Sequence, residues 1–185
     1  MSVRPPRWAI VAGLGLVLVL VASRWALFGG GDDDSGQAGG AAACPDSSVE
    51  RRPLDGLGEI AIRITGTAGQ VTDGCALLAD EEAERARGLM GQHDLRGYDG
   101  MLFRFPAPSS TRFYMRDTLI PLTIAFFAPD GSFVSAADMT PCPATTEACP
   151  LYAATGPYLF ALEVPAGSLG RLGAGPGSVL SFPAP

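Results

Sequence analysis

The sequence predicts an all-β fold, a compact single-domain sandwich or small barrel with one short helix, preceded by an N-terminal transmembrane or signal segment. Short apolar runs recur along residues 51–185, and Gly, Pro and Asp residues that favour turns separate them. Only one stretch of this region carries the charge pattern of a helix. Many short strands with regularly spaced turns are typical of β-sandwiches and small barrels.

The N-terminal segment is predicted to enter a membrane. Arg4 and Arg7 precede an uncharged apolar stretch at residues 8–22, and three aspartates follow at residues 32–34. Basic residues before such a stretch favour an orientation with the N-terminus inside the cell. We expect residues 1–28 to form an uncleaved anchor at the cell membrane, with the folded domain outside the cytoplasm. A cleaved signal peptide is the alternative, and it would make the protein secreted.

Residues 29–50 are predicted to form a flexible tether. They are rich in Gly, Ala and Asp and poor in large apolar side chains. Such a composition cannot bury enough apolar surface to offset the entropy of ordering. The folded domain is therefore expected over residues 51–185.

Within the domain, residues 59–65 alternate with three isoleucines on one face, which predicts a strand. Residues 80–90 carry acidic residues first and basic residues later, which suits a helix because these charges match its dipole. Further strands are predicted at the apolar runs 101–105, 112–115, 122–127, 132–136, 158–164 and 179–182.

Four cysteines in a domain outside the cytoplasm are expected to pair. Six residues separate Cys142 from Cys149 in a Pro- and Thr-rich loop, where a disulfide closes easily. Their spacing is wider than that of most zinc-binding cysteine pairs, so a metal site is the weaker alternative. Cys44 and Cys75 form a second candidate pair, although Cys44 in the tether is equally compatible with a free thiol.

The methionines of the domain raise the alternative of a soft-metal site, such as one for copper, near Cys142. Met101 and Met115 lie inside apolar runs, however, where methionine usually fills the core. The single histidine, His93, has no second histidine with which to share a metal. We therefore expect no metal and no cofactor.

Catalytic motifs are sparse: the sequence has neither a nucleophile elbow nor a phosphate-binding glycine loop. Its densest polar cluster is Tyr114, Arg116, Asp117 and Thr118, between two apolar runs where the rim of a cavity would form. These four residues are the candidate ligand-binding site. The competing interpretation is a surface ion pair between Arg116 and Asp117 that contributes little.

The charge balance argues against a nucleic-acid partner. The chain carries 13 basic and 19 acidic residues, for a net charge of −6, and it has no basic run outside the N-terminus. Binding to a phosphate backbone requires a basic surface.

Several ordered segments resemble a bacterial and archaeal family called domain of unknown function 192. They are Arg87-Gly88-Leu89-Met90-Gly91, Gly100-Met101-Leu102-Phe103 with Phe105, Phe113 to Leu122, Asp130-Gly131, Pro141-Cys142, Cys149-Pro150 and Ala161 to Gly167. The resemblance covers residues 75–180. It implies a compact all-β domain with one short helix, often behind a signal or anchor segment, and no established activity.

The chain departs from the usual pattern of that family at its polar positions. Tyr114, Arg116 and Asp117 stand where the family usually has Trp, Lys and Asn, and Thr123 and Ser178 stand where Asp is usual. If those positions form a binding site in the family, this member binds something different or nothing.

The leading functional hypothesis is a non-enzymatic, membrane-tethered domain that binds a small ligand or a partner protein of the cell envelope. The site would be bordered by residues 114–118 and by the loop at residues 141–150. The first alternative is an enzyme that acts on envelope polymers or small polar metabolites through Arg116, Asp117 and Glu163. It requires a carboxyl group with a raised pKa in a cavity, yet strand alternation predicts that Glu163 faces solvent. The second alternative is a copper accessory protein, which requires reduced Cys142 and Cys149.

Overall fold

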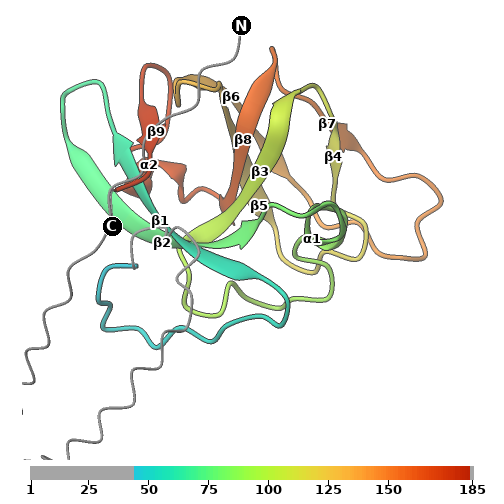
Figure 1. Cartoon of the computed structure of the whole chain (residues 1–185). Helices are drawn as coiled ribbons and strands as arrows, with labels where there is room; N and C mark the ends of the chain where they lie inside the picture. Colours follow the sequence, from blue (N-terminus) through green and yellow to red (C-terminus); the bar gives the residue numbers. More distant parts are fainter. Residues whose placement is uncertain (1–43, 184–185) are drawn as a thin grey trace, which may run out of the picture. The chain divides into compact units, whose positions relative to one another are not determined.

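The computed structural model describes residues 44–183, which fold into a mostly β domain (Figure 1). Seven strands form one sheet in the order β6-β5-β8-β3-β2-β1-β9, and β4 and β7 form a separate two-stranded sheet. The strands are β1 (Gly58–Thr65), β2 (Val71–Ala79), β3 (Gly100–Ser109), β4 (Phe113–Tyr114), β5 (Leu122–Phe127), β6 (Phe133–Met139), β7 (Leu151–Tyr152), β8 (Tyr158–Pro165) and β9 (Val179–Ser181). The helices are α1 (Glu82–Arg87) and α2 (Leu169–Leu172).

The all-β prediction is confirmed, in the form of a curled sheet that makes a half-barrel. Although β6 and β9 stand at opposite ends of the strand order, they meet at one point. The amide of Phe133 donates a hydrogen bond of 3.0 Å to the Ser178 carbonyl, and the amide of Leu180 donates one of 2.8 Å to the Gly131 carbonyl. These bonds bring the two edges of the sheet together and so limit exposed strand edges.

Both faces of the central strands β5 and β8, and of the adjoining parts of β2 and β3, are buried, because a separate apolar cluster covers each face. The cluster inside the curl includes Ile62 of β1, Phe127 of β5 and Leu180 of β9. The cluster on the outer face includes Met101 of β3 and Phe126 of β5, and it is closed by the polypeptide around α1, β4 and β7. Side chains of these central strands therefore alternate between two cores rather than between core and solvent.

This double burial explains where the sequence-based prediction of the elements was wrong. β2 was not predicted, because its run from Cys75 to Ala79 is entirely buried and shows no alternation. The predicted helix at residues 80–90 is shorter, since α1 ends where Gly88 adopts a positive φ of 50°. The short elements β7 and α2 were also missed.

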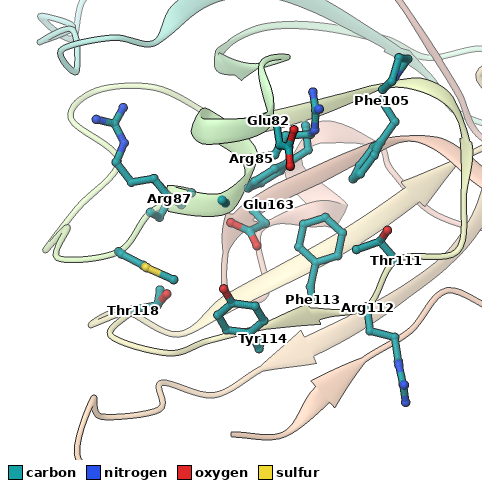
Figure 2. A pocket seen from close by; sticks show the side chains of 16 residues that line it. Glu82, Arg85, Arg87, Phe105, Thr111, Arg112, Phe113, Tyr114, Thr118 and Glu163 are labelled. Atoms are coloured by element: carbon teal, nitrogen blue, oxygen red, sulfur yellow. The ribbon is translucent and has the colours of Figure 1, made fainter.

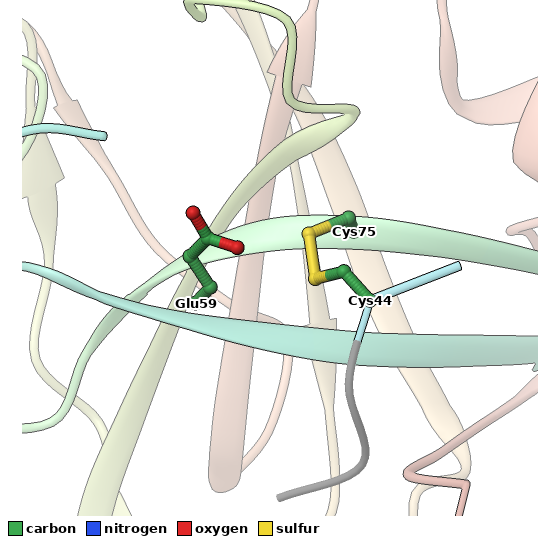
Figure 3. Close-up of side chains that lie close together, drawn as sticks. All are labelled: Cys44, Glu59 and Cys75. Carbon is green, nitrogen blue, oxygen red and sulfur yellow. A yellow bond between two sulfur atoms is a disulfide. The ribbon is translucent and has the colours of Figure 1, made fainter. Parts of the chain in front are cut away.

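Both cysteine pairs are disulfides, with Cα–Cα distances of 5.2 Å for Cys44–Cys75 and 5.8 Å for Cys142–Cys149. Figure 3 shows the first of them joining Cys44 to β2 beside Glu59 of β1. The start of the described chain is therefore attached covalently to the central part of the sheet. The copper alternative required reduced Cys142 and Cys149, and this condition is not met.

No helix among residues 44–183 is both long and apolar enough to cross a membrane. The predicted anchor or signal segment at residues 1–28, and the predicted tether up to residue 43, lie outside the described part of the chain.

Candidate functional site

A cavity of about 470 Å³ opens on the outer face of the sheet, between α1 and β4 (Figure 2). Its size lies in the range of small-molecule sites. Its lining residues come from four parts of the chain: α1 and the turn after it, β3, the segment around β4, and β8. They are Glu82, Arg85, Ala86, Arg87, Gly88, Leu89, Met90, Phe103, Phe105, Pro106, Thr111, Arg112, Phe113, Tyr114, Thr118 and Glu163.

Glu163 provides the carboxyl group at the base of the cavity. It lies on β8 between two apolar neighbours in the sheet register, Met101 of β3 and Ile124 of β5. Only 5% of its surface is exposed, and Figure 2 shows its carboxylate directed into the cavity. Burial raises the pKa of the Glu163 carboxyl from an ordinary 4.5 to about 8. At neutral pH the empty cavity therefore presents mainly a neutral carboxylic acid.

The sequence-based prediction that Glu163 faces solvent is wrong. Alternation along a strand places a polar residue in water only when one face of the sheet is exposed, and here both faces are covered. The signal available in the sequence was a single charge within the otherwise apolar run Tyr158 to Val164. A charged residue in a strand of that composition is either paired or functional.

Aromatic side chains make the wall of the cavity next to Glu163. The ring of Phe113 packs edge-on against Phe103, with ring centroids 5.1 Å apart, and against Phe126 at 5.7 Å. These contacts fix the orientation of Phe113, because edge-to-face pairs are favourable and the rings are tightly packed. Tyr114 follows on β4, where it is 43% exposed, and its hydroxyl points toward Glu163 in Figure 2.

The opposite wall is α1, a helix of 6 residues whose start is stabilised by local capping. The side chain of Glu84 accepts hydrogen bonds of 3.0 Å from the amides of Asp80 and Glu81, which satisfies two donors at the helix start. Arg85 donates to the carbonyls of Asp80 and Arg104, and its guanidinium lies 5.3 Å from the centroid of the Phe105 ring.

The guanidinium groups of the other two lining arginines, Arg87 and Arg112, are not directed at Glu163. Arg87 donates a hydrogen bond of 2.9 Å to the Asp55 carbonyl. The guanidinium of Arg112 points away from the centre of the cavity in Figure 2. Within residues 44–183, the ionisable group at the base of the cavity is therefore Glu163 alone.

The structure separates the four predicted site residues into two pairs. Tyr114 and Thr118 line the cavity, and Thr118 is buried. Arg116 instead donates hydrogen bonds of 3.2 to 3.4 Å to the carbonyls of Ala144, Thr146 and Glu147, in the loop closed by the Cys142–Cys149 disulfide.

Asp117 is exposed and has a positive φ of 53°. Its amide donates a hydrogen bond of 2.8 Å to the Cys142 carbonyl, and its own carbonyl accepts a hydrogen bond of 2.8 Å from the Gly91 amide. Asp117 and Arg116 therefore hold loops together beside the cavity rather than lining it. No residue of the loop at residues 141–150 belongs to the lining either.

Cys44, Glu59 and Cys75 place three possible metal-ligand atoms within 4.8 Å of one another (Figure 3). Both sulfurs are in the disulfide, and the hydroxyl of Tyr98 donates a hydrogen bond to Glu59. A disulfide sulfur is not the thiolate that binds metal, so this group is structural.

Comparison with known proteins identifies the class of protein to which this fold and cavity belong. The family model DUF192, described as "Uncharacterized ACR", matches residues 63–182, and the chain belongs to this family. The match begins before residue 75, the start of the sequence resemblance, because it includes the end of β1 and all of β2.

Two solved structures share the fold. A protein of unknown function from Novosphingobium aromaticivorans DSM 12444 is 32% identical, with a TM-score of 0.63, and the alignment covers 78% of this chain and 99% of that one. A protein from Sinorhizobium meliloti 1021, described as a candidate transcription regulator, is 27% identical, with a TM-score of 0.62, and the alignment covers 70% of this chain and 98% of that one. No curated protein matches the chain.

Proposed function

We propose that the domain binds a small ligand in the cavity between α1 and β4, with an apolar body against the aromatic wall and a polar group against Glu163. The observation that carries this proposal is the placement of Glu163, whose buried carboxyl opens into a cavity of about 470 Å³. An ionisable group in the middle of a sheet is costly unless it has a partner. A ligand supplies that partner.

A fragment screen on the full chain, read by ligand-observed NMR, tests this function. Ala86→Trp is expected to abolish binding, because Ala86 lines the cavity and the larger ring would occupy it. Ala86 is exposed, so the variant is expected to remain folded. Ala83→Trp is the matched control, since Ala83 is an exposed residue of α1 that does not line the cavity. Fragments that bind all three chains equally would contradict the proposal.

A second candidate function is acid–base catalysis by Glu163 in the same cavity. It is favoured by the pKa of about 8, which suits a group that exchanges protons near neutral pH. Arg116 and Asp117 no longer support this alternative, because neither lines the cavity. An activity lost in Glu163→Gln, with a rate that follows an ionisation near pH 8, would favour the enzyme over the binding module.

We propose that the domain lies outside the cytoplasm and is carried by the segment at residues 1–28. Two disulfides support this location, because such bonds persist in oxidising compartments. Accessibility of the domain to protease in intact cells tests the location, and carbonate extraction of membranes tests the attachment. A protease-protected domain contradicts the location, and release from the membrane favours the cleaved form.

A role in transcription, which the description of the Sinorhizobium protein names, is not supported for this chain. The net charge of −6 disfavours a phosphate backbone as the partner. If the fragment screen finds no ligand, a partner protein of the cell envelope becomes the better hypothesis, and the exposed pair Tyr114 and Leu151 across β4 and β7 is where it would bind.

A further inference from the structure

The chemistry around Glu163 restricts the kind of ligand that the proposed site would take. Its neighbours in the sheet, Met101 and Ile124, are fully buried and apolar. Burial is the one cause of its raised pKa, and neither a hydrogen bond nor a charge from residues 44–183 contributes. An apolar side chain would fill this position at lower cost, so the carboxyl group is best explained by a partner that the chain itself does not provide.

The titratable groups nearest to Glu163 do not act as that partner. The lining contains three arginines, yet the guanidiniums of Arg85 and Arg87 donate to backbone carbonyls, and that of Arg112 points away. Glu82 is on the exposed side of α1 and has the same sign of charge as an ionised Glu163. Tyr114 supplies a hydroxyl and Thr118 another, and both are neutral hydrogen-bonding groups.

The walls beside the carboxyl group suit a cation. Phe113 and Tyr114 lie next to Glu163 in Figure 2, and aromatic faces attract ammonium and guanidinium groups. Arg85 already uses the Phe105 ring in this way at the rim, at 5.3 Å from its centroid.

We infer that the ligand is a small organic cation, an alkyl- or arylalkylammonium compound whose ammonium group pairs with the Glu163 carboxylate while its apolar part contacts Phe113 and Tyr114. This inference rests on the proposed ligand-binding function. It adds the class of ligand, which the size of the cavity does not determine. When the cation binds, Glu163 gives up its proton to solvent, so that the bound pair is ammonium and carboxylate.

Isothermal titration of the full chain with two matched probes tests the inference. The probes are 2-phenylethylamine, an ammonium ion at neutral pH, and 2-phenylethanol, which has the same ring and chain but no charge. We expect the amine to bind at least about tenfold more tightly than the alcohol. Glu163→Gln is expected to weaken binding of the amine by about tenfold or more and to leave the affinity for the alcohol unchanged.

Asp117→Asn is the matched control for the change of charge. It also removes one carboxylate, at an exposed position outside the cavity lining where Asn tolerates the positive φ. We expect it to leave the affinities of both probes unchanged. An equal loss of amine binding in both variants would overturn the inference, because it would reflect the overall charge of the chain.

Proton release provides a readout that needs no variant and is therefore independent of any folding defect. Below pH 8, binding of the amine is expected to release a proton from Glu163, detected as a dependence of the heat on the ionisation enthalpy of the buffer. The affinity should rise about tenfold per pH unit up to that point and fall above a pH of about 10, where the amine loses its own charge.

The outcomes separate this inference from the function on which it rests. Equal or tighter binding of the alcohol, or amine binding that Glu163→Gln leaves unchanged, overturns the inference of a cationic ligand paired with Glu163 and leaves the cavity function in place. The same holds if neither probe binds but the fragment screen yields ligands that Ala86→Trp blocks. Failure of both probes and of the screen overturns both proposals.

Discussion

At the scale of single residues, Glu163 shows how the fold sets the chemistry of the cavity. It is the one acidic or basic side chain that is buried within residues 44–183. Desolvation determines its protonation state, since no residue of the described chain pairs with the carboxylate and stabilises the ionised form. The same property gives the group a measurable effect on folding.

Glu163→Gln is expected to flatten the pH dependence of stability. Between pH 4.5 and about 8 the folded chain keeps a proton on Glu163 that the unfolded chain has released. The folded state binds more protons than the unfolded state in this window, so the stability of the wild-type chain falls as pH rises. The decrease is at most about 1.4 kcal/mol per pH unit.

Urea unfolding of both chains across this pH window measures the effect. Asp117→Asn serves as the control and should retain the slope of the wild-type chain, because Asp117 is exposed. Parallel slopes for the wild-type chain and Glu163→Gln would show that Glu163 does not hold a proton in the folded state.

Arg116 stabilises the loop at residues 141–150 through its hydrogen bonds to that loop. Arg116→Ala is expected to lower the free energy of unfolding by about 1 kcal/mol, because three long hydrogen bonds to backbone carbonyls are lost. It should increase hydrogen exchange in the loop at residues 141–150 and leave ligand affinity unchanged. Arg112→Ala, at an exposed position that lines the cavity, should leave loop exchange unchanged. If both variants affect that loop equally, Arg116 does not hold it.

At the scale of secondary-structure elements, the contact between β6 and β9 closes the curled sheet. Its backbone hydrogen bonds join Phe133 to Ser178 and Leu180 to Gly131. Gly131 has a φ of +81°, and a Cβ atom there would overlap the carbonyl oxygen of Leu180. The closure therefore depends on glycine for both backbone conformation and space.

Gly131→Ala is expected to destabilise the domain by more than Gly69→Ala does. Gly69 has a similar φ of +78° but open space around it, so alanine there suffers only the backbone cost of about 1 kcal/mol. At Gly131 the overlap adds to that cost and breaks the bond from Leu180. Thermal unfolding of the two variants measures the difference, and hydrogen exchange at the Leu180 amide reports the closure. Equal melting temperatures would show that the sheet edges are not joined there.

At the scale of the whole molecule, the two disulfides constrain the chain to different extents. Cys44–Cys75 spans 31 positions in the sequence, whereas Cys142–Cys149 spans 7. In the chain-entropy description, a longer closed loop removes more freedom from the unfolded state. The first bond also fixes the segment before β1 to the sheet, and this segment supplies the Asp55 carbonyl that holds Arg87 of α1.

Loss of the Cys44–Cys75 bond is therefore expected to cost about 1 kcal/mol more than loss of the Cys142–Cys149 bond. The matched variants are Cys44→Ser with Cys75→Ala and Cys149→Ser with Cys142→Ala, since Cys75 and Cys142 are the buried members of the pairs. Urea unfolding of each double variant against the wild-type chain provides the comparison. A larger loss from the shorter bond would mean that local strain or packing, not loop entropy, determines their contributions.

The sequence by itself determined the features that depend on neighbouring residues. Isoleucine alternation placed β1, turn residues separated β3, β5 and β8, and the short spacing of Cys142 and Cys149 indicated their disulfide. The ordered motifs indicated the family, which the comparison confirmed. These patterns are local, so the rest of the fold is not needed to interpret them.

Only the tertiary structure decided the features that depend on what covers each face of the sheet. Alternation distinguishes core from solvent when one face is open, and in this domain a second apolar cluster covers the other face. For that reason β2 showed no pattern and Glu163 was assigned to solvent. Arg116 and Asp117 were assigned to a cavity that they do not line, because their hydrogen bonds run to loops that are distant in the sequence. The cavity itself forms between α1, β4 and β8, which lie far apart in the sequence, and long-range packing alone brings them together.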